Sequence, residues 1–196
     1  MTDYYTTSSE VRQALGLRAT DTADDALIVA NLPRVKDEID TECKRTFVTT
    51  ARARYYHQRA ARIVGDTLYL GEDLYSLSSL RNADGTTSEN GSVIATSDVW
   101  LDPPSGPPYG SITLQPGQTW IFNTTGRVMV SGDWGYSSSA PPVINQAATR
   151  LNCYYYKQKD AQVYDVQADA ATGLVTVPKG MPDDIKRKIE HLKRRF

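Results

Sequence analysis

The sequence has 196 residues, 40% of them hydrophobic, and its formal net charge is −1. This length fits one ordinary domain or one domain with an insertion, and the near-neutral charge gives no global electrostatic reason to bind nucleic acid or a membrane. The sequence has no apolar run long enough to span a membrane, and the N-terminus MTDYYTTSSE lacks the basic and apolar regions of a signal peptide. We therefore expect a protein that is made in the cytoplasm.

Two helices are predicted in the first 48 residues. The segment SSEVRQALGL (8–17) reads as a short helix that Ser8 or Ser9 caps and that Gly16 ends in a left-handed conformation. A second, longer helix should open at Asp21–Thr22. Pro33 lies inside it and should either kink it or split it into two collinear pieces. Its apolar residues recur every three or four positions, which predicts one buried face formed by Ile28, Leu32, Val35, Ile39 and Cys43.

From about Thr49 to Gly132 the hydrophobic period changes to two. Turn residues separate seven short alternating segments, which are RARYYHQ, DTLYLG, YSLSSLRN, SVIATSDVW, GSITLQ, TWIFN and GRVMVSG. This pattern predicts six or seven short strands. The segment DPPSGPPYG (102–110) contains four prolines, which cannot donate backbone hydrogen bonds, so we expect an exposed excursion there.

The stretch DWGYSSSAPP (133–142) marks an abrupt change from strand to helix. Its serines are typical of a loop, and its two prolines fit the start of a helix. The next helix should bury one stripe formed by Ile144, Ala147, Ala148, Leu151 and Tyr155. Residues 162–179 read as extended or loop, and a last short helix should begin at Pro182, with acids in its first turn and bases in its last. We therefore interpret 133–142 as a joint and not as a reactive loop.

These elements predict an α+β protein. We expect a helical bundle of two N-terminal helices, one central long helix and a short C-terminal helix, with an inserted antiparallel β region. The expected segments are the N-terminal helices (1–48), the β-rich insertion (49–132), the joint with the long helix and extended segment (133–178), and a basic helical arm (179–196).

The residues that could carry chemistry are few and scattered. The histidines are His57 and His191, and neither has a ligand-like spacing to Cys, Asp or Glu. Cys43 and Cys153 fall within predicted helices, where a buried thiol is the usual interpretation. The sequence has no G-x-S-x-G elbow, G-x-G-x-x-G turn or P-loop. We expect no catalytic residue, no cofactor and no metal site, and hence a protein that is not an enzyme.

Three groups of residues could be either structural or interacting. The basic C-terminal run could be a solvated face that complements the helix dipole, or a contact with an acidic partner or DNA phosphates. Trp134 and Tyr136 could pack at the end of the sheet, against the next helix, or form an exposed aromatic contact. In the run 154–156, one tyrosine should be core and at least one should face solvent or a neighbouring subunit. We assign Tyr154 and Tyr155 to either the core or an interface.

The order of these segments resembles a known family. A short helix ending in LGL precedes DTADDALIVANLPRVKDEIDTECKRTF, and a β insertion containing LYLGEDLYSLSSLRNADG follows. Then come VMVSGDWGY, APPVINQAATRL and the closing PKGMPDDIKRKIEHLKRRF. This arrangement resembles the head–tail connector (adaptor, or head completion) proteins of tailed bacteriophages, and the resemblance spans nearly the whole chain.

The resemblance implies a structural protein that forms a ring under the portal and extends the DNA channel toward the tail. Its implied partners are the portal protein, neighbouring copies of itself (usually twelve), a downstream neck, stopper or tail protein, and DNA that passes without sequence specificity. The resemblance implies no membrane contact. It implies a protein that is made in the host cytoplasm and located in the virion, at the capsid vertex or neck. The segment 179–196 would be a portal-docking arm, with contacts from Lys186, Arg187, Lys188, Ile189, Leu192, Arg194, Arg195 and Phe196.

Two other classes of function stay open at this point. A β-rich binding module could recognise carbohydrate or peptide through exposed Trp100, Trp120 and Tyr109, although the flanking helices are not typical of such modules. A hydrolase with an unrecognised site is a third possibility, for which the sequence nominates no reactive residue.

Overall fold

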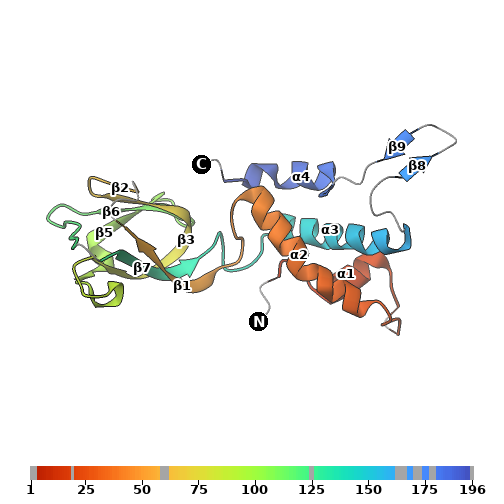
Figure 1. Ribbon diagram of the computed structural model, residues 1–196, viewed down its shortest axis with the longest axis horizontal. Helices are drawn as coiled ribbons and strands as arrows, with labels where there is room; N and C mark the ends of the chain where they lie inside the picture. The colour runs from red at the N-terminus through yellow and green to blue at the C-terminus, as the bar shows by residue number, and fades with distance from the viewer. Residues whose placement is uncertain are drawn as a thin grey trace. The chain divides into compact units, whose positions relative to one another are not determined.

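The computed structural model describes residues 4–18, 20–57, 62–123, 126–161, 167–169, 174–176 and 180–194 (Figure 1). Its contacts divide the chain into two compact units. The helical unit comprises Met1–Lys44 and Ala140–Phe196, and the β unit comprises Arg45–Ser139. The β unit is therefore one continuous stretch of chain inserted between two halves of the helical unit.

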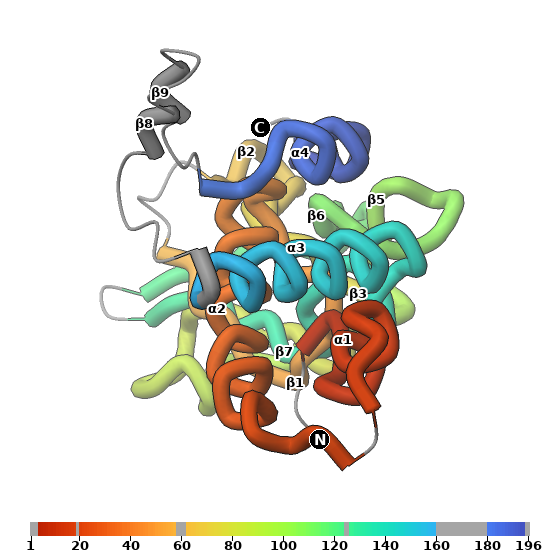
Figure 2. Tube along the Cα trace, turned by 90° about the vertical axis from the view of Figure 1, so that its right-hand side faces the viewer, coloured from red at the N-terminus to blue at the C-terminus, as the bar shows by residue number. Residues whose placement is uncertain are grey.

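The helical unit is built around α3. Its helices are α1 (Ser8–Leu15), α2 (Asp25–Cys43), α3 (Pro142–Ala161) and α4 (Asp183–Ile189), and a single turn of 3₁₀-helix (Glu190–Leu192) follows α4. Two short strands, β8 (Gln167–Asp169) and β9 (Leu174–Thr176), pair as an antiparallel hairpin between α3 and α4. Figure 2 shows α3 between α4 on one side and α1 and α2 on the other, and α3 contacts all three.

The predicted buried faces of α2 and α3 are confirmed. The five apolar positions on each helix that share one face are all buried, namely Ile28, Leu32, Val35, Ile39 and Cys43 on α2 and Ile144, Ala147, Ala148, Leu151 and Tyr155 on α3. The helix α3 begins at the second proline of the joint, as expected. A buried hydrogen bond from Asn152 Nδ2 to the Ile28 carbonyl oxygen (3.2 Å) joins the two helices.

The helix boundaries differ from the predictions in three places. The cap of α1 is Thr7 and not Ser8 or Ser9, and Gly16 ends the helix with a left-handed φ of 70° as predicted. The helix α2 begins at Asp25 and not at Asp21–Thr22. It continues through Pro33 as one helix, so the split into two pieces is wrong; tertiary burial on both sides of the proline outweighs the lost backbone hydrogen bond.

The β unit is one antiparallel sheet of seven strands. They are β1 (Thr50–Tyr56), β2 (Ile63–Val64), β3 (Thr67–Arg81), β4 (Val93–Ile94), β5 (Val99–Asp102), β6 (Tyr109–Leu114) and β7 (Val128–Trp134). The main order is β1-β7-β3-β6-β5, and β2 and β4 each pair with β3. The α+β class is confirmed, but this large sheet dominates the fold, so a helical bundle describes the helical unit alone.

The strand assignments are partly wrong. The segments DTLYLG and YSLSSLRN form one long strand, β3, and SVIATSDVW forms two short strands separated by a 3₁₀ turn at Thr96–Asp98. The segment TWIFN is not a strand, because its contact with the sheet is a single bridge between Phe122 and Ala83. Trp120 and Phe122 still pack against the sheet core, which explains their alternation. The proline segment 102–110 is a largely exposed connection between β5 and β6, as predicted.

The long strand β3 pairs with different strands along its two halves. On one edge, Thr67–Tyr69 and Leu74 pair with β6; on the other edge, residues from Leu74 to Arg81 pair with β7. The register shifts within both pairings. The sheet encloses one core of buried side chains, which includes Tyr56, Leu68, Leu70, Leu74, Leu80, Ile94, Ile112, Leu114, Val128, Val130 and Trp134.

The cap of α1 provides a first test. The Thr7 side chain accepts a hydrogen bond from the Glu10 N–H (3.2 Å), and Glu10 accepts one from the Thr7 N–H (2.7 Å). Because Thr7→Ala removes this capping box, we expect it to lower the free energy of unfolding by about 1 kcal/mol. The matched control Ser9→Ala, at an exposed position in the first turn, should change it by less than about 0.5 kcal/mol. Urea denaturation of the full chain measures both values, and equal losses would contradict the assignment of Thr7 as the cap.

The pKa of Glu10 provides a second test. Burial acts to raise this pKa, but hydrogen bonds from Thr7, Asn145 and Thr6 together outweigh burial, so the pKa lies below its usual value of 4.5. A lowered pKa stabilises the folded state above the unfolded value and loses this contribution as the pH falls through the folded value. We therefore expect Glu10→Gln to be less stable than the wild type at pH 7, with the difference shrinking toward pH 3. Thermal unfolding across this range measures it, and a difference that grows on acidification would contradict the assignment.

Candidate interaction surfaces

The chain enters and leaves the β unit at one place. The Tyr136 N–H donates to the Thr46 carbonyl oxygen (2.9 Å), and the Ser137 N–H donates to the Phe47 carbonyl oxygen (3.1 Å). In return, the Thr49 N–H donates to the Ser137 carbonyl oxygen (3.1 Å). The two connections to the helical unit are thus fastened to each other by backbone hydrogen bonds inside the β unit.

Buried aromatic side chains hold these connections in place. Trp134 has no exposed surface, and its indole Nε1 donates to the Arg52 carbonyl oxygen (3.0 Å). Phe47 is also fully buried and meets the half-buried Tyr136 edge-on, with ring centroids 5.7 Å apart. Trp134 therefore belongs to the sheet core, whereas one side of Tyr136 reaches the surface.

A buried ion pair lies beside this aromatic group. The Arg45 guanidinium is 3.2 Å from the Asp73 carboxylate and 4.9 Å from the centroid of the Tyr136 ring. The two charged side chains are 14% and 7% exposed, so each depends on the other for its charge to be tolerated. Gly135 brings the backbone close, because a Cβ there would lie 2.8 Å from the Val48 carbonyl oxygen, and its N–H donates to the Asp73 carbonyl oxygen.

The two predicted tyrosines of α3 differ in environment. Tyr155 is buried, its hydroxyl donates to Glu38, and the Arg34 guanidinium lies 3.8 Å from its ring centroid. Burial and this hydrogen bond raise the pKa of Tyr155. Tyr154 is half-buried, with its ring centroid 5.6 Å from that of Tyr155. Tyr155 is therefore a core residue, and Tyr154 is the one with surface available for a contact.

The predicted docking arm is already folded onto the helical unit. Ile189 is buried with Ile185, while Lys186, Leu192 and Arg194 are half-buried and Arg187 and Lys188 are exposed. The Arg194 N–H donates to the Cys43 carbonyl oxygen (2.9 Å), and ion pairs join Lys193 to Glu42 and Arg150 to Asp184. Arg195 and Phe196 lie outside the described residues.

The side chains that most often bind metal ions do not cluster in the described residues. Within them, no group of three or more His, Cys, Asp or Glu side chains could hold a metal ion. Cys43 is buried and Cys153 is half-buried, and neither forms a disulfide within the described residues. Among the described helices, none is both long and apolar enough to cross a lipid bilayer.

The three aromatic residues considered for a binding module do not form one platform. Trp100 on β5 is 55% exposed. Trp120 and Tyr109, in contrast, are partly buried and pack against the sheet core. A flat stack of three exposed rings, the usual means of holding a sugar or peptide, is therefore not present at these positions.

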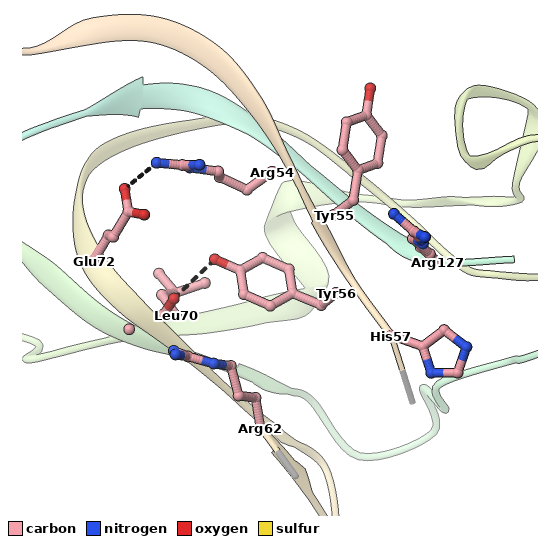
Figure 3. A pocket seen from close by; sticks show the side chains of 9 residues that line it. Arg54, Tyr55, Tyr56, His57, Arg62, Leu70, Glu72 and Arg127 are labelled. Carbon is pink, nitrogen blue, oxygen red and sulfur yellow. Dashed lines mark hydrogen bonds and ion pairs between the residues drawn. The ribbon is translucent and has the colours of Figure 1, made fainter. Parts of the chain in front are cut away.

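Sequence reasoning missed a basic pocket in the β unit, which we call the arginine seam (Figure 3). It consists of Arg52 and Arg54 on β1, Arg62 beside β2, Arg127 before β7, and Glu72 on β3. Arg52 and Arg54 bind the carboxylate of Glu72, and Arg62 and Arg127 line the same pocket as Arg54 and Glu72. The signal was present in the segment RARYYHQRAAR (52–62), whose arginines are dense for a strand and its turn.

The seam exists because β3 bends. The strand β7 lies between β1 and β3. Arg54 of β1 pairs with Val130 of β7, which in turn pairs with Leu80 of β3, so Arg54 and Leu80 are at the same level of the sheet. Yet Arg54 bonds Glu72, eight residues away along β3, or about 26 Å in a straight strand. The sheet must therefore curl so that the first half of β3 approaches the outer edge of β1.

Side chains alone bridge β1 and this part of β3 in the described residues. The Tyr56 hydroxyl donates to the Leu70 carbonyl oxygen (3.0 Å), and Arg52 and Arg54 bind the same Glu72 oxygen at 2.6 and 2.5 Å. Between the strands lies an open pocket of about 300 Å³, lined also by His57, Gly71 and Arg127. Gly71, with a φ of 74°, leaves room for Arg62, since a Cβ there would collide with the guanidinium.

The buried joint provides a third test. Because the indole of Trp134 fills the sheet core, we expect Trp134→Ala to lower the free energy of unfolding by about 3 kcal/mol. The matched control is Trp100→Ala, at a tryptophan that is 55% exposed, which should cost less than about 1 kcal/mol. Thermal and urea unfolding compare the two variants. Unchanged stability of Trp134→Ala together with lost assembly would instead make Trp134 a contact residue.

The comparisons with known proteins concern the fold. No protein-family model and no curated protein sequence matches the chain. Three solved structures of gene transfer agent particles contain a similar chain. They are the neck of an empty particle computed with C6 symmetry (20% identity, 95% of this chain and 88% of that chain, TM-score 0.63), the virion of a native particle (21%, 95% and 88%, 0.62), and the neck of a native particle computed with C12 symmetry (19%, 94% and 86%, 0.60).

These matches cover almost the entire chain, including both the helical unit and the β unit. At this level of identity they establish a common fold. The chain therefore shares its fold with chains of gene transfer agent particles, which agrees with the resemblance to head–tail connectors seen in its sequence.

Proposed function

We propose that this chain is a structural connector in the neck of a phage-like particle. In this role it forms a ring under the portal, extends the DNA channel and provides a platform for the neck or tail. The observation that carries the proposal is the fold shared over 95% of the chain with a chain from a gene transfer agent neck. The order of motifs in the sequence supports the same role independently.

Ring assembly follows from this role. The neighbouring necks were computed with C6 and C12 symmetry, which supports a ring, and the family resemblance suggests twelve copies. Tyr154 offers a half-buried aromatic surface on the central helix of the unit, suited to a contact between copies. DNA would pass through the ring without sequence specificity, and the net charge of −1 suits a channel that must not hold phosphates tightly.

Contact with the portal is assigned to the C-terminal arm, residues 179–196. Because Ile189 is buried in the helical unit, the docking surface consists of charged side chains, chiefly Arg187 and Lys188. Lys188 Nζ donates a hydrogen bond to Gln146 Oε1 (2.9 Å), which links α4 to α3. The matching portal surface should therefore be acidic, and the contact should weaken as salt concentration rises.

A fourth test measures assembly directly. Light scattering with negative-stain imaging, on the protein alone and mixed with its cognate portal, should reveal rings with a central hole. Charge reversal at Arg187 and Lys188 should reduce portal binding at least tenfold, because each exchanges an attraction for a repulsion. The matched control is charge reversal at Lys157, an exposed lysine of α3 outside the arm.

The outcomes separate the parts of the proposal. Rings alone or on the portal support the connector role and give the number of copies. A monomer that forms rings on the portal alone means that the portal templates assembly. A monomer that ignores the portal overturns the proposal, and equal effects of the arm and control variants overturn the assignment of the arm.

A further inference from the structure

We propose that the arginine seam of the β unit binds an extended acidic peptide of a partner protein. The peptide would lie along the outer edge of β1 and place a carboxylate in the pocket between Arg62 and Arg127. This inference rests on the geometry of the β unit and does not depend on the connector role.

The seam already binds one carboxylate. Arg52 and Arg54 both bind the same oxygen of Glu72, at 2.6 and 2.5 Å. The three side chains are about 40% exposed, so this internal pair is open to exchange with a carboxylate from outside. Glu72 therefore shows how a carboxylate of the ligand could bind. In the free protein it pairs with two of the four arginines, Arg52 and Arg54.

Two arginines of the seam keep their charge available. In the part of the chain that the structure describes, no carboxylate forms an ion pair with Arg62 or Arg127, while both line the pocket with Arg54. Figure 3 shows these side chains and Tyr56 around the opening between β1 and β3. Guanidinium groups bind carboxylates through paired N–H donors, which gives such a contact both energy and direction.

The outer edge of β1 supplies the second half of the site. Among the described residues, β1 pairs with β7 alone, so its other edge faces the seam without a strand partner. An unpaired strand edge binds extended peptides by main-chain hydrogen bonds. Because Arg52 and Arg54 are two residues apart on β1, they stand on one face and match acidic side chains at alternate positions of a paired peptide.

A peptide fits these observations better than a nucleic acid does. Nucleic acid binding relies on basic groups that follow a line of phosphates. Here three arginines of the seam, Arg54, Arg62 and Arg127, surround one pocket of about 300 Å³ and do not follow a line. A strand edge can pair with a peptide backbone but has no equivalent partner in a nucleic acid. The geometry therefore favours carboxylates carried by an extended chain.

The test uses the full-length protein and fluorescence anisotropy. The probe is a labelled peptide of alternating Glu and Thr, ETETET, blocked at its C-terminus. We expect saturable binding that Arg62→Gln and Arg127→Gln each weaken about tenfold, as expected for the loss of a charge-assisted hydrogen bond. The matched control is Arg81→Gln on β3, whose guanidinium donates to the Gly91 carbonyl oxygen away from the seam (3.1 Å) and which should leave binding unchanged.

A second variant is expected to raise the affinity for the peptide. Glu72→Gln removes the internal carboxylate and frees Arg52 and Arg54, so the acidic peptide should bind several-fold more tightly. A variant that merely disturbed the fold would not increase affinity. Weaker binding by Glu72→Gln, or equal losses in the Arg62, Arg127 and Arg81 variants, would overturn the site.

Competing ligands complete the test. The peptide KTKTKT should not bind, and millimolar inorganic phosphate should displace ETETET no better than chloride at equal ionic strength. If phosphate displaces the peptide selectively, or if duplex DNA binds with the same dependence on Arg62 and Arg127, the seam is a phosphate site and the peptide proposal is wrong. Absence of ETETET binding to the wild type overturns it as well.

Discussion

The structure depends on how the two connections to the β unit are fastened together. If only one of the two connections of an inserted unit were held in place, the strand next to the other connection could fray. Here Thr46–Thr49 and Tyr136–Ser137 are joined by backbone hydrogen bonds, Trp134 is buried in the sheet core, and the fully buried Phe47 packs against Tyr136. The buried ion pair of Arg45 and Asp73 adds a polar contact beside them, and removing either partner would leave the other charge buried and unpaired. The sheet can therefore keep its shape although its chain begins and ends in another unit.

The sequence was most informative where burial repeats at a fixed period. The stripes of α2 and α3 were predicted residue by residue, because a helix buries every third or fourth side chain whatever it packs against. The sheet was harder to predict. The segment 119–123 alternates like a strand because Trp120 and Phe122 pack inward, yet it lacks a strand neighbour that would make it one. Thr7 was missed as a cap because four hydroxyl residues occur in a row, and propensity alone does not choose among them.

The arginine seam lies beyond what local pattern can predict. Arg54 and Glu72 are separated by a turn and part of a strand, and they meet because the sheet curls along β3, whose pairing with β6 on one edge and with β7 on the other shifts in register. Such a shift depends on the pairing of four strands and leaves no periodic signal of its own. Besides the dense arginines of 52–62, Gly71 was a local hint, since a glycine within a strand often marks a bend or a close approach. The domain boundaries predicted at 48/49 and 132/133 and the roles given to the arm and the joint stay predictions.

The order of the two units along the chain has a consequence for synthesis on the ribosome. The β unit is continuous in sequence, so its core can close once Trp134 and the following turn have emerged. The helical unit is discontinuous, and α2 has only α1 to pack against until α3 is made. Because domains generally fold as units during synthesis, we expect the first two helices to lack the cover of α3 while the sheet forms. We therefore expect the β unit to complete its fold before the helical unit does.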